Sequence, residues 1–349
     1  MKKQINIQPN FAFLNLIKSK FRDHKNDNFR LYKSGRYSLY FGLIKIMKNN
    51  PQIKNIYVPT FICPQVLMPL DKLNLNVNFY QVDENLSLDK EYLNKTINSE
   101  SIIIVINYFG FPSDWEYFEE LREKTKCVLI SDNCHSLLSK YKGKNLSQYG
   151  DLSFNSFRKI IPLMSGSQLF YNTIEYNDKQ SKTRFPNLGE ILYMFRSLKP
   201  SFIKTRLGDT KLVGEYNPLK DNKYFFNPKA DNTIDILSDS LFNNYIDNHQ
   251  ELTNKRQQNY QAWLNYLPKS EFIFFNNLKL DEEITPYAFP CIAKSKNVMN
   301  KWILWGRENN ISIINWANKN DNLNHHLKLI LLFPIVPDRD IKLTLSNYD

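Results

Sequence analysis

The segment from Cys127 to Thr173 constrains the fold of this chain most strongly. Its apolar run, Cys127 to Ile130, changes abruptly into the polar group Ser131 to His135. A buried parallel strand gives this pattern when its carboxyl end reaches a crevice. A second strand-like segment, Asp151 to Phe157, leads directly into Arg158 and Lys159. We therefore expect a site where an acid from one strand end lies close to a lysine from another.

Pyridoxal phosphate enzymes use such a pair. A lysine forms a Schiff base with the cofactor aldehyde, and a carboxylate keeps the pyridine nitrogen protonated so that the ring can accept electrons. Asp132 and Lys159 are the candidates for these two roles. Because lysines are common on protein surfaces, this spacing alone does not single out the cofactor.

A series of short motifs, taken together, resembles the DegT/DnrJ/StrS family of sugar aminotransferases. The family pattern runs approximately E-D-x-x-Q/H, y-k-G-k, G-D, S-F-x-x-x-K and G-G. The matching segments here are Asp132 to His135, Tyr141 to Lys144, Gly150-Asp151, Ser156 to Lys159 and Gly166-Ser167. Upstream matches are Ser34 to Leu39, Ile56 to Phe61, Phe79 to Asp83 and Asn107 to Gly110.

The resemblance implies a fold-type I pyridoxal phosphate enzyme. Alternating strand-like and helical segments independently predict a mainly parallel sheet covered by helices, that is, an α/β fold. We expect an N-terminal arm over residues 1–30, a large cofactor-binding domain over 31–245 and a smaller C-terminal α+β domain over 246–349. A helix is expected within the arm, from Phe11 to Arg22.

The resemblance also implies roles for individual residues. Lys159 would hold the cofactor and then act as general base and acid, while Asp132 would pair with the ring nitrogen. His135 would lie beside the ring oxygen. The remaining expected cofactor contacts are Gly35, Arg36 and Ser156 at the phosphate, Cys63 at the ring-stacking position, and Asn227.

The chain departs from the family pattern in places. Lys159 follows Ser156 by three residues instead of five, but Gly166 keeps the usual step after the lysine, which indicates a two-residue deletion. An alternative alignment places Ile161 at the lysine position, as in relatives that dehydrate sugars without a Schiff-base lysine. Three further positions are altered: Arg36 replaces a threonine, Cys63 an aromatic residue and Ser167 a glycine.

By resemblance, the predicted reaction transfers an amino group from glutamate to a nucleotide-linked keto sugar. In the family this reaction serves surface polysaccharide or secondary-metabolite biosynthesis, and homodimers build their active sites from both chains. Two alternatives stay open. One is another pyridoxal phosphate reaction, such as sugar dehydration or transamination of a different carbonyl substrate. The other is a non-catalytic binding relative with the same fold.

Composition limits the classes of ligand that we expect the protein to bind and indicates its cellular compartment. The net charge of +11 could favour anionic ligands. The lysines are nevertheless scattered without a basic run, so nucleic-acid binding is not expected. The four cysteines show no metal-ligand spacing and indicate reduced thiols in a cytoplasmic enzyme. No signal peptide is recognisable, and no apolar run approaches the roughly 20 residues that span a bilayer.

Overall fold

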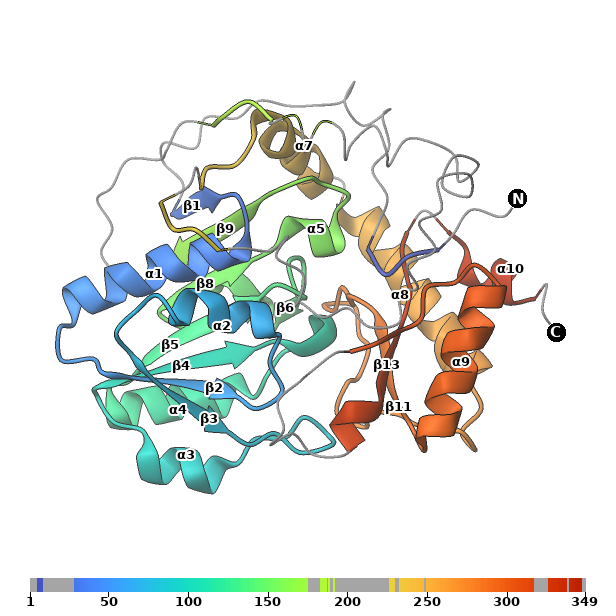
Figure 1. The fold of residues 1–349 in the computed structure, drawn as a ribbon, viewed down its shortest axis with the longest axis horizontal. Helices are drawn as coiled ribbons and strands as arrows, with labels where there is room; N and C mark the ends of the chain where they lie inside the picture. Colours follow the sequence, from blue (N-terminus) through green and yellow to red (C-terminus); the bar gives the residue numbers. More distant parts are fainter. Residues whose placement is uncertain are drawn as a thin grey trace.

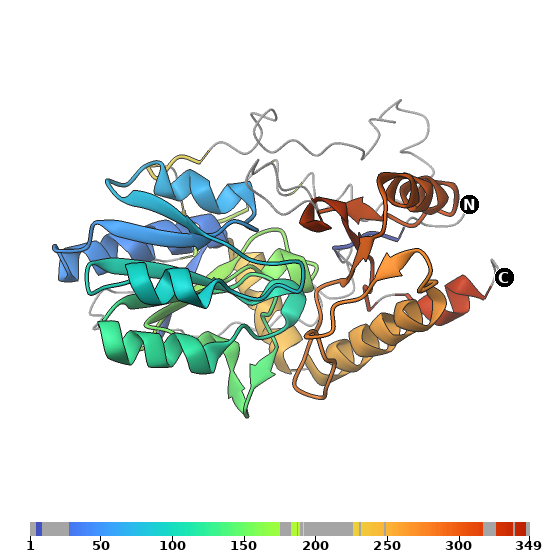
Figure 2. The ribbon, with the colours of Figure 1, turned by 90° about the horizontal axis from the view of Figure 1, so that it is seen from below.

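Two sheets organise the molecule in the computed structural model. The structure describes residues 5–8, 28–174, 183–186, 188, 191, 226–229, 232–247, 249–316, 326–337 and 339–346. The expected helix from Phe11 to Arg22 lies outside the described residues, as does most of the region between 175 and 225. A seven-stranded sheet and a four-stranded sheet lie side by side, each with its own helices (Figures 1 and 2).

The large sheet is mainly parallel, as the sequence predicts. Its strands run in the spatial order β1-β9-β8-β5-β4-β2-β3. Strands β2, β3, β4, β5 and β8 pair in parallel, whereas β9 pairs antiparallel with both β8 and the edge strand β1. The strand bounds are β1 (Phe29–Tyr32), β2 (Asn55–Pro59), β3 (Asn76–Tyr80), β4 (Ser101–Ile106), β5 (Val128–Asn133), β8 (Leu152–Asn155) and β9 (Ser167–Tyr171).

Helices cover both faces of this sheet, which is why its central strands are apolar on both sides. Along β4, Ile102 and Ile104 pack in one core cluster with Leu39 and Leu43 of helix α1, while Ile103 packs in the other cluster. The second cluster also includes residues of helices α3 and α4. The helices are α1 (Gly35–Asn49), α2 (Pro64–Leu70), α3 (Lys90–Thr96) and α4 (Trp115–Thr125).

The C-terminal part carries the small antiparallel sheet, in the order β10-β11-β13-β12. An N-terminal segment joins this part, because Ile5 forms a β-bridge with Ile311. The elements are α7 (Ile236–Asp247), α8 (His249–Tyr266), β10 (Phe272–Ile273), β11 (Phe289–Ala293), α9 (Lys296–Glu308), β12 (Ile314–Asn315), β13 (Ile330–Phe333) and α10 (Ile341–Leu345).

Several local features differ from the predicted elements. The motif segment Asn107 to Gly110 follows the end of β4 at Ile106 and forms a tight turn, in which Phe109 adopts a positive φ of 55°. The strand expected up to Phe157 ends earlier, at Asn155, and a one-turn helix, α5 (Phe157–Ile160), follows. A short hairpin, β6 (Lys140–Tyr141) and β7 (Lys144–Asn145), completes the set.

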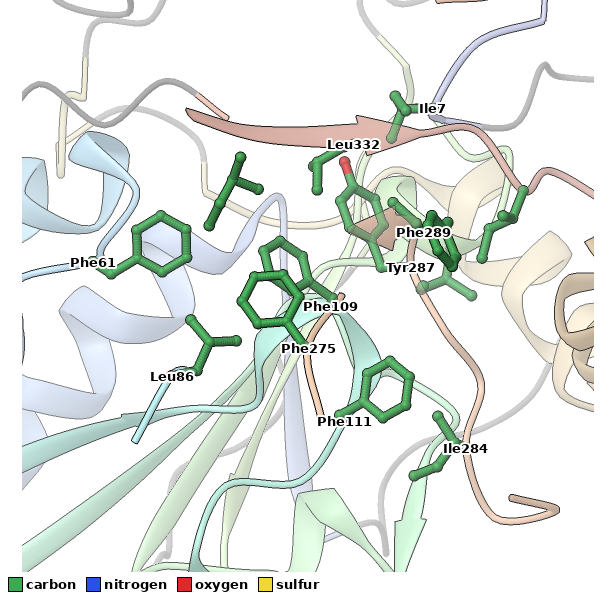
Figure 3. Packing of buried hydrophobic residues seen from close by; sticks show 14 of the residues in the cluster. Ile7, Phe61, Leu86, Phe109, Phe111, Phe275, Ile284, Tyr287, Phe289 and Leu332 are labelled. Atoms are coloured by element: carbon green, nitrogen blue, oxygen red, sulfur yellow. The ribbon is translucent and has the colours of Figure 1, made fainter. Parts of the chain in front are cut away.

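The edge of the large sheet that faces the small sheet holds the carboxyl ends of the parallel strands. The arrowhead of β4 points toward β11 and β13 in Figure 1. Residues from segments next to strands of both sheets, among them Phe109 and Tyr287, converge in this region (Figure 3). In the described part of the chain, no helix is both long enough and apolar enough to cross a bilayer.

Candidate active site

Asp132 lies at the carboxyl end of β5, between its neighbours β4 and β8. The apolar residues before it are buried by helices on both faces, so the first acid of the strand reaches the open sheet edge. The carboxylate is only 5% exposed. Its Oδ1 accepts a hydrogen bond from the Cys134 amide at 2.9 Å. Burial raises the pKa of Asp132, while the Lys159 cation and the Cys134 amide act in the opposite direction.

Lys159 comes to the same place from the helix that follows β8. Its Nζ lies 5.9 Å from the ring centroid of Tyr287. Burial by itself would lower the pKa of this amine, but the acidic groups around it outweigh burial and raise the pKa. These groups are Cys134, Cys63, Tyr287 and Asp132. The structure therefore brings together the acid and the lysine that were predicted to meet.

Ile161, the residue that the alternative alignment places at the lysine position, lies elsewhere. Its side chain is fully buried in the main hydrophobic core cluster. Lys159 rather than Ile161 thus presents its side chain near Asp132.

His135 is held by aromatic side chains from three parts of the chain. Its ring stacks on Tyr287 with centroids 4.4 Å apart, and Trp316 meets it edge-on at 5.0 Å. The amide of Phe109 donates to Nδ1 at 3.4 Å, which leaves the proton of a neutral imidazole on Nε2. Burial and the Lys159 cation lower the pKa of His135, so the neutral ring is favoured. Nε2 is buried and has no hydrogen-bond partner among the described residues.

The N-terminus of α1 forms the next part of the site. Ser34 precedes this 15-residue helix, and its buried hydroxyl neither caps the helix nor contacts another polar atom of the described chain. A Cβ at Gly35 would lie 3.1 Å from the Asn155 carbonyl oxygen and 3.1 Å from Cys134 Sγ. Glycine thus lets the helix end approach β5 and β8 closely. The exposed amides and the dipole of a helix N-terminus suit an anion.

The four remaining residues that were predicted to contact the cofactor come from different segments of the chain. Cys63 immediately precedes α2 and interacts with Lys159. Ser156 immediately precedes α5 and is 6% exposed.

The Arg36 guanidinium donates to Met68 Sδ at 3.5 Å, so one of its nitrogens points to α2. Asn227 lies beside α1, because its carbonyl oxygen accepts from the Tyr37 hydroxyl at 3.2 Å.

Tyr287 is a site residue that the sequence analysis did not select. It is 3% exposed, and its ring contacts both His135 and the Lys159 amine. It lies just before β11, in the part of the chain that the motifs hardly cover. A tyrosine next to a proline in an otherwise apolar stretch carries no periodic or motif signal. Its role becomes visible only in the tertiary structure.

The central segment of the chain is similar to a known family of enzymes. Residues 46–167 match the model of the DegT/DnrJ/EryC1/StrS aminotransferase family. GDP-4-keto-6-deoxy-D-mannose 3-dehydratase of Yersinia pseudotuberculosis is 29% identical over 105 residues, which are 29% of this chain and 27% of that protein. GDP-perosamine synthase of Escherichia coli O157:H7 is 32% identical over 80 residues, 22% of each chain. The matched segment spans little more than a quarter of these curated relatives at most.

Solved structures extend the likeness to the whole fold. The structure of Spr1654 from Streptococcus pneumoniae in its PMP form superposes with a TM-score of 0.69 at 13% identity, over 99% of this chain and 96% of that one. The E. coli GDP-4-keto-6-deoxy-D-mannose-3-dehydratase gives 0.66 at 14% identity, over 96% and 88% of the two chains. The expected fold-type I architecture is confirmed. This chain has the fold of the sugar aminotransferases, and its residues 46–167 match the model of the DegT/DnrJ/EryC1/StrS aminotransferase family.

Proposed function

We propose that this protein is a pyridoxal phosphate-dependent aminotransferase. The observation that carries the proposal is the meeting of Lys159 and Asp132 beside unpaired buried polar groups, at the carboxyl edge of the large sheet. An amine, a buried acid and a helix N-terminus in one place match the three reactive parts of this cofactor: its aldehyde, its ring nitrogen and its phosphate.

The residues present fit the cofactor at each of these parts. Asp132 would pair with the ring nitrogen, and the Nε2 proton of His135 would find in the ring oxygen the acceptor it lacks. The phosphate would lie at the N-terminus of α1, where Ser34 Oγ has a free hydrogen-bonding capacity. Gly35, Ser156, Cys63 and Asn227 border this region and are kept as proposed contacts, and Arg36 is kept as a proposed phosphate ligand.

The chain's own groups account for the proton transfers. The bound cofactor supplies an electron sink conjugated to the substrate nitrogen. With the cofactor bound, Lys159 Nζ would take a proton from the carbon next to that nitrogen and return it at another carbon. Asp132 would pair with the protonated ring nitrogen, whose positive charge would favour the carboxylate form. The buried Tyr287 and His135 rings limit the access of water to the amine.

The proposed substrate is a nucleotide-linked keto sugar, with glutamate as the amino donor. GDP-perosamine synthase and the Campylobacter jejuni UDP-4-amino-4,6-dideoxy-N-acetyl-beta-L-altrosamine transaminase, 31% identical over 91 residues, support this substrate class. We place the enzyme in surface polysaccharide or secondary-metabolite biosynthesis, acting in the cytoplasm as a homodimer with shared active sites.

Sugar dehydration is the second candidate. It is favoured by the names of two curated relatives, both GDP-4-keto-6-deoxy-D-mannose 3-dehydratases. The geometry favours transamination over a lysine-free dehydratase, because Lys159 lies beside Asp132 while Ile161 is buried in the core. The same pair argues against a relative that only binds a ligand.

An absorbance spectrum of the purified protein with added pyridoxal phosphate tests the proposal. We expect a visible band that is absent in Lys159→Ala and that glutamate converts to the spectrum of the pyridoxamine form. Turnover should fall by roughly 10³-fold or more in this variant, since it loses both the cofactor bond and the general base.

Lys142→Ala is the matched control, since Lys142 is an exposed lysine paired with Glu116 outside the site. Its spectrum should equal that of the wild type. A lysine-dependent band that ignores glutamate would support dehydration instead. A spectrum identical in the wild type and Lys159→Ala would refute the assignment of the lysine.

A further inference from the structure

Arg256 of α8 joins two backbone segments that supply active-site residues. The side chain is completely buried. Its Nη2 donates to the carbonyl oxygen of Ile160 at 3.0 Å. Its Nη1 donates to the carbonyl oxygens of Pro286 and Tyr287 at 3.2 Å and 3.1 Å. One guanidinium group therefore binds the end of α5 and the segment before β11 at the same time.

The helix that carries Lys159 depends on such a contact. Helix α5 has four residues, Phe157–Ile160, so it cannot be stable on hydrogen bonds of its own. The carbonyl groups at the end of a helix need partners outside it. Arg256 provides one for Ile160, the residue directly after Lys159. The position of the Lys159 amine therefore depends on how α8 holds α5.

The second segment is fixed from the large domain as well. The Tyr287 amide donates to the Phe109 carbonyl oxygen at 2.8 Å, and the Thr285 amide donates to Ser139 Oγ at 3.0 Å. Gly110 has a φ of +104°, and a Cβ there would lie 2.6 Å from the Thr285 carbonyl oxygen. The backbone at Tyr287 is thus fixed by hydrogen bonds and close packing. Arg256 can therefore orient α5 relative to this fixed segment.

We propose that Arg256 is a positioning residue that fixes the Lys159 amine relative to Tyr287 and, through the Tyr287 ring, relative to His135. The inference rests on the proposed function, because the alignment matters only if Lys159 reacts. A guanidinium group suits the task, since its planar fork donates in fixed directions to several acceptors and stays charged when buried. A lysine at this position keeps the charge but cannot bind both segments in the same geometry.

Arg256→Lys separates positioning from charge. The test is the acylation rate of Lys159 by acetic anhydride, followed by mass spectrometry of its peptide over a range of pH, in the full-length chain without added cofactor. In the wild type, the acidic groups around Lys159 hold its pKa above the ordinary value. If α5 is released, the amine moves away from them and its pKa falls. With the lower pKa, more of the amine is in its free-base form, and we expect roughly threefold faster acylation at pH 8.

Thr253→Val is the matched control. Thr253 lies one turn before Arg256 on α8 and bonds Thr285 with an oxygen–oxygen distance of 2.7 Å. It contacts the same segment without reaching α5, so its loss should lower the unfolding temperature and leave the acylation profile of Lys159 unchanged. Equal acylation profiles in Arg256→Lys and Thr253→Val would overturn the positioning role.

A second substitution covers the case in which Arg256→Lys fails to fold. Arg256→Gln removes the buried charge altogether and still offers one donor group, so faster acylation of Lys159 in this variant would also support the role. Failure of both variants to fold would make Arg256 a requirement of the whole fold and overturn a specific role. Because no cofactor is present, a negative cofactor spectrum refutes the proposed function without affecting this result.

Discussion

Two groups of buried polar residues lie close to the carboxyl end of β5, and they differ in how their hydrogen bonds are used. Ser131 and Asn133 belong to a network centred on Asn107 in which the polar atoms are paired. His135 and Ser34, by contrast, each keep a buried polar atom without a partner in the described structure. The same strand end thus contains a structural polar cluster and a candidate ligand site.

The Asn107 network shows what complete pairing looks like. Its side-chain amide donates to Asn133 Oδ1 at 2.7 Å and to Ser131 Oγ at 3.1 Å. Its Oδ1 accepts from the Ser113 amide and from Trp115 Nε1 at 2.9 Å and 3.0 Å. Buried polar groups of folded proteins are nearly always paired in this way. At His135 and Ser34 a partner is missing among the described residues, which fits the cofactor proposed for this place.

Breaking the paired network should have the largest effect on stability. Asn107→Ala leaves the Trp115 indole N–H and the Ser113 amide without their acceptor in a buried place. We expect a loss of about 2–3 kcal/mol in the free energy of unfolding, measured by urea denaturation. Asn94→Ala is the control, because Asn94 makes an exposed hydrogen bond to the Tyr117 hydroxyl, and it should cost far less. Similar losses of unfolding free energy in Asn107→Ala and Asn94→Ala would contradict a particular contribution of the buried network to stability.

The unpaired histidine should make stability depend on pH. The folded state lowers the pKa of His135, whose ordinary value is 6.5. Below pH 6.5 the unfolded chain binds a proton that the folded chain does not, so stability falls as pH decreases and is fully present above that pH. We expect the unfolding free energy to drop by about 1 kcal/mol between pH 7 and 5.5 relative to His135→Gln. A difference between the two proteins that stays constant with pH would contradict this.

The smallest effect is expected at Ser34. Since its hydroxyl has no partner in the described chain, Ser34→Ala should leave the stability of the cofactor-free protein unchanged or slightly higher. Its affinity for pyridoxal phosphate should fall roughly fivefold, corresponding to the loss of one hydrogen bond of about 1 kcal/mol. A titration of the protein with pyridoxal phosphate, followed by absorbance, measures this affinity. Ser38→Ala is the control with a paired hydroxyl, because Ser38 Oγ forms a hydrogen bond with Ser167 Oγ at 2.6 Å. This variant should lower the stability of the cofactor-free protein.

The parts of the fold that follow from local patterns were predictable. The strand leading to Asp132 and the parallel strands beside it stand out as apolar runs that end in polar residues. The strand β13 was not predicted, because its apolar run Ile330–Phe333 has only four residues and shows no period that distinguishes a strand from a buried helix segment. The edge strand β1 contains a buried arginine and no alternation, so its pairing with β9 depends on the finished sheet.

The site was predictable only to the extent that it lies on motifs. Asp132, Lys159 and His135 come from one continuous stretch and are brought together in the structure. Tyr287 and Arg256 act through contacts that are distant in sequence and, for Arg256, through backbone carbonyl groups. Every residue has a backbone carbonyl group, so the residue that accepts a hydrogen bond from Arg256 can be of any type. Neither composition nor periodicity could therefore have revealed these two residues.

The glycine at position 110 has a consequence for how this molecule can change over time. With no side chain, it lets the backbone at Thr285 and Pro286 pass within van der Waals distance of the turn after β4. The two sheets are thus joined at a point with no spare volume. Insertions or deletions near this joint have to preserve the crossing of these two backbones. Evolutionary change in this chain should therefore accumulate away from that crossing.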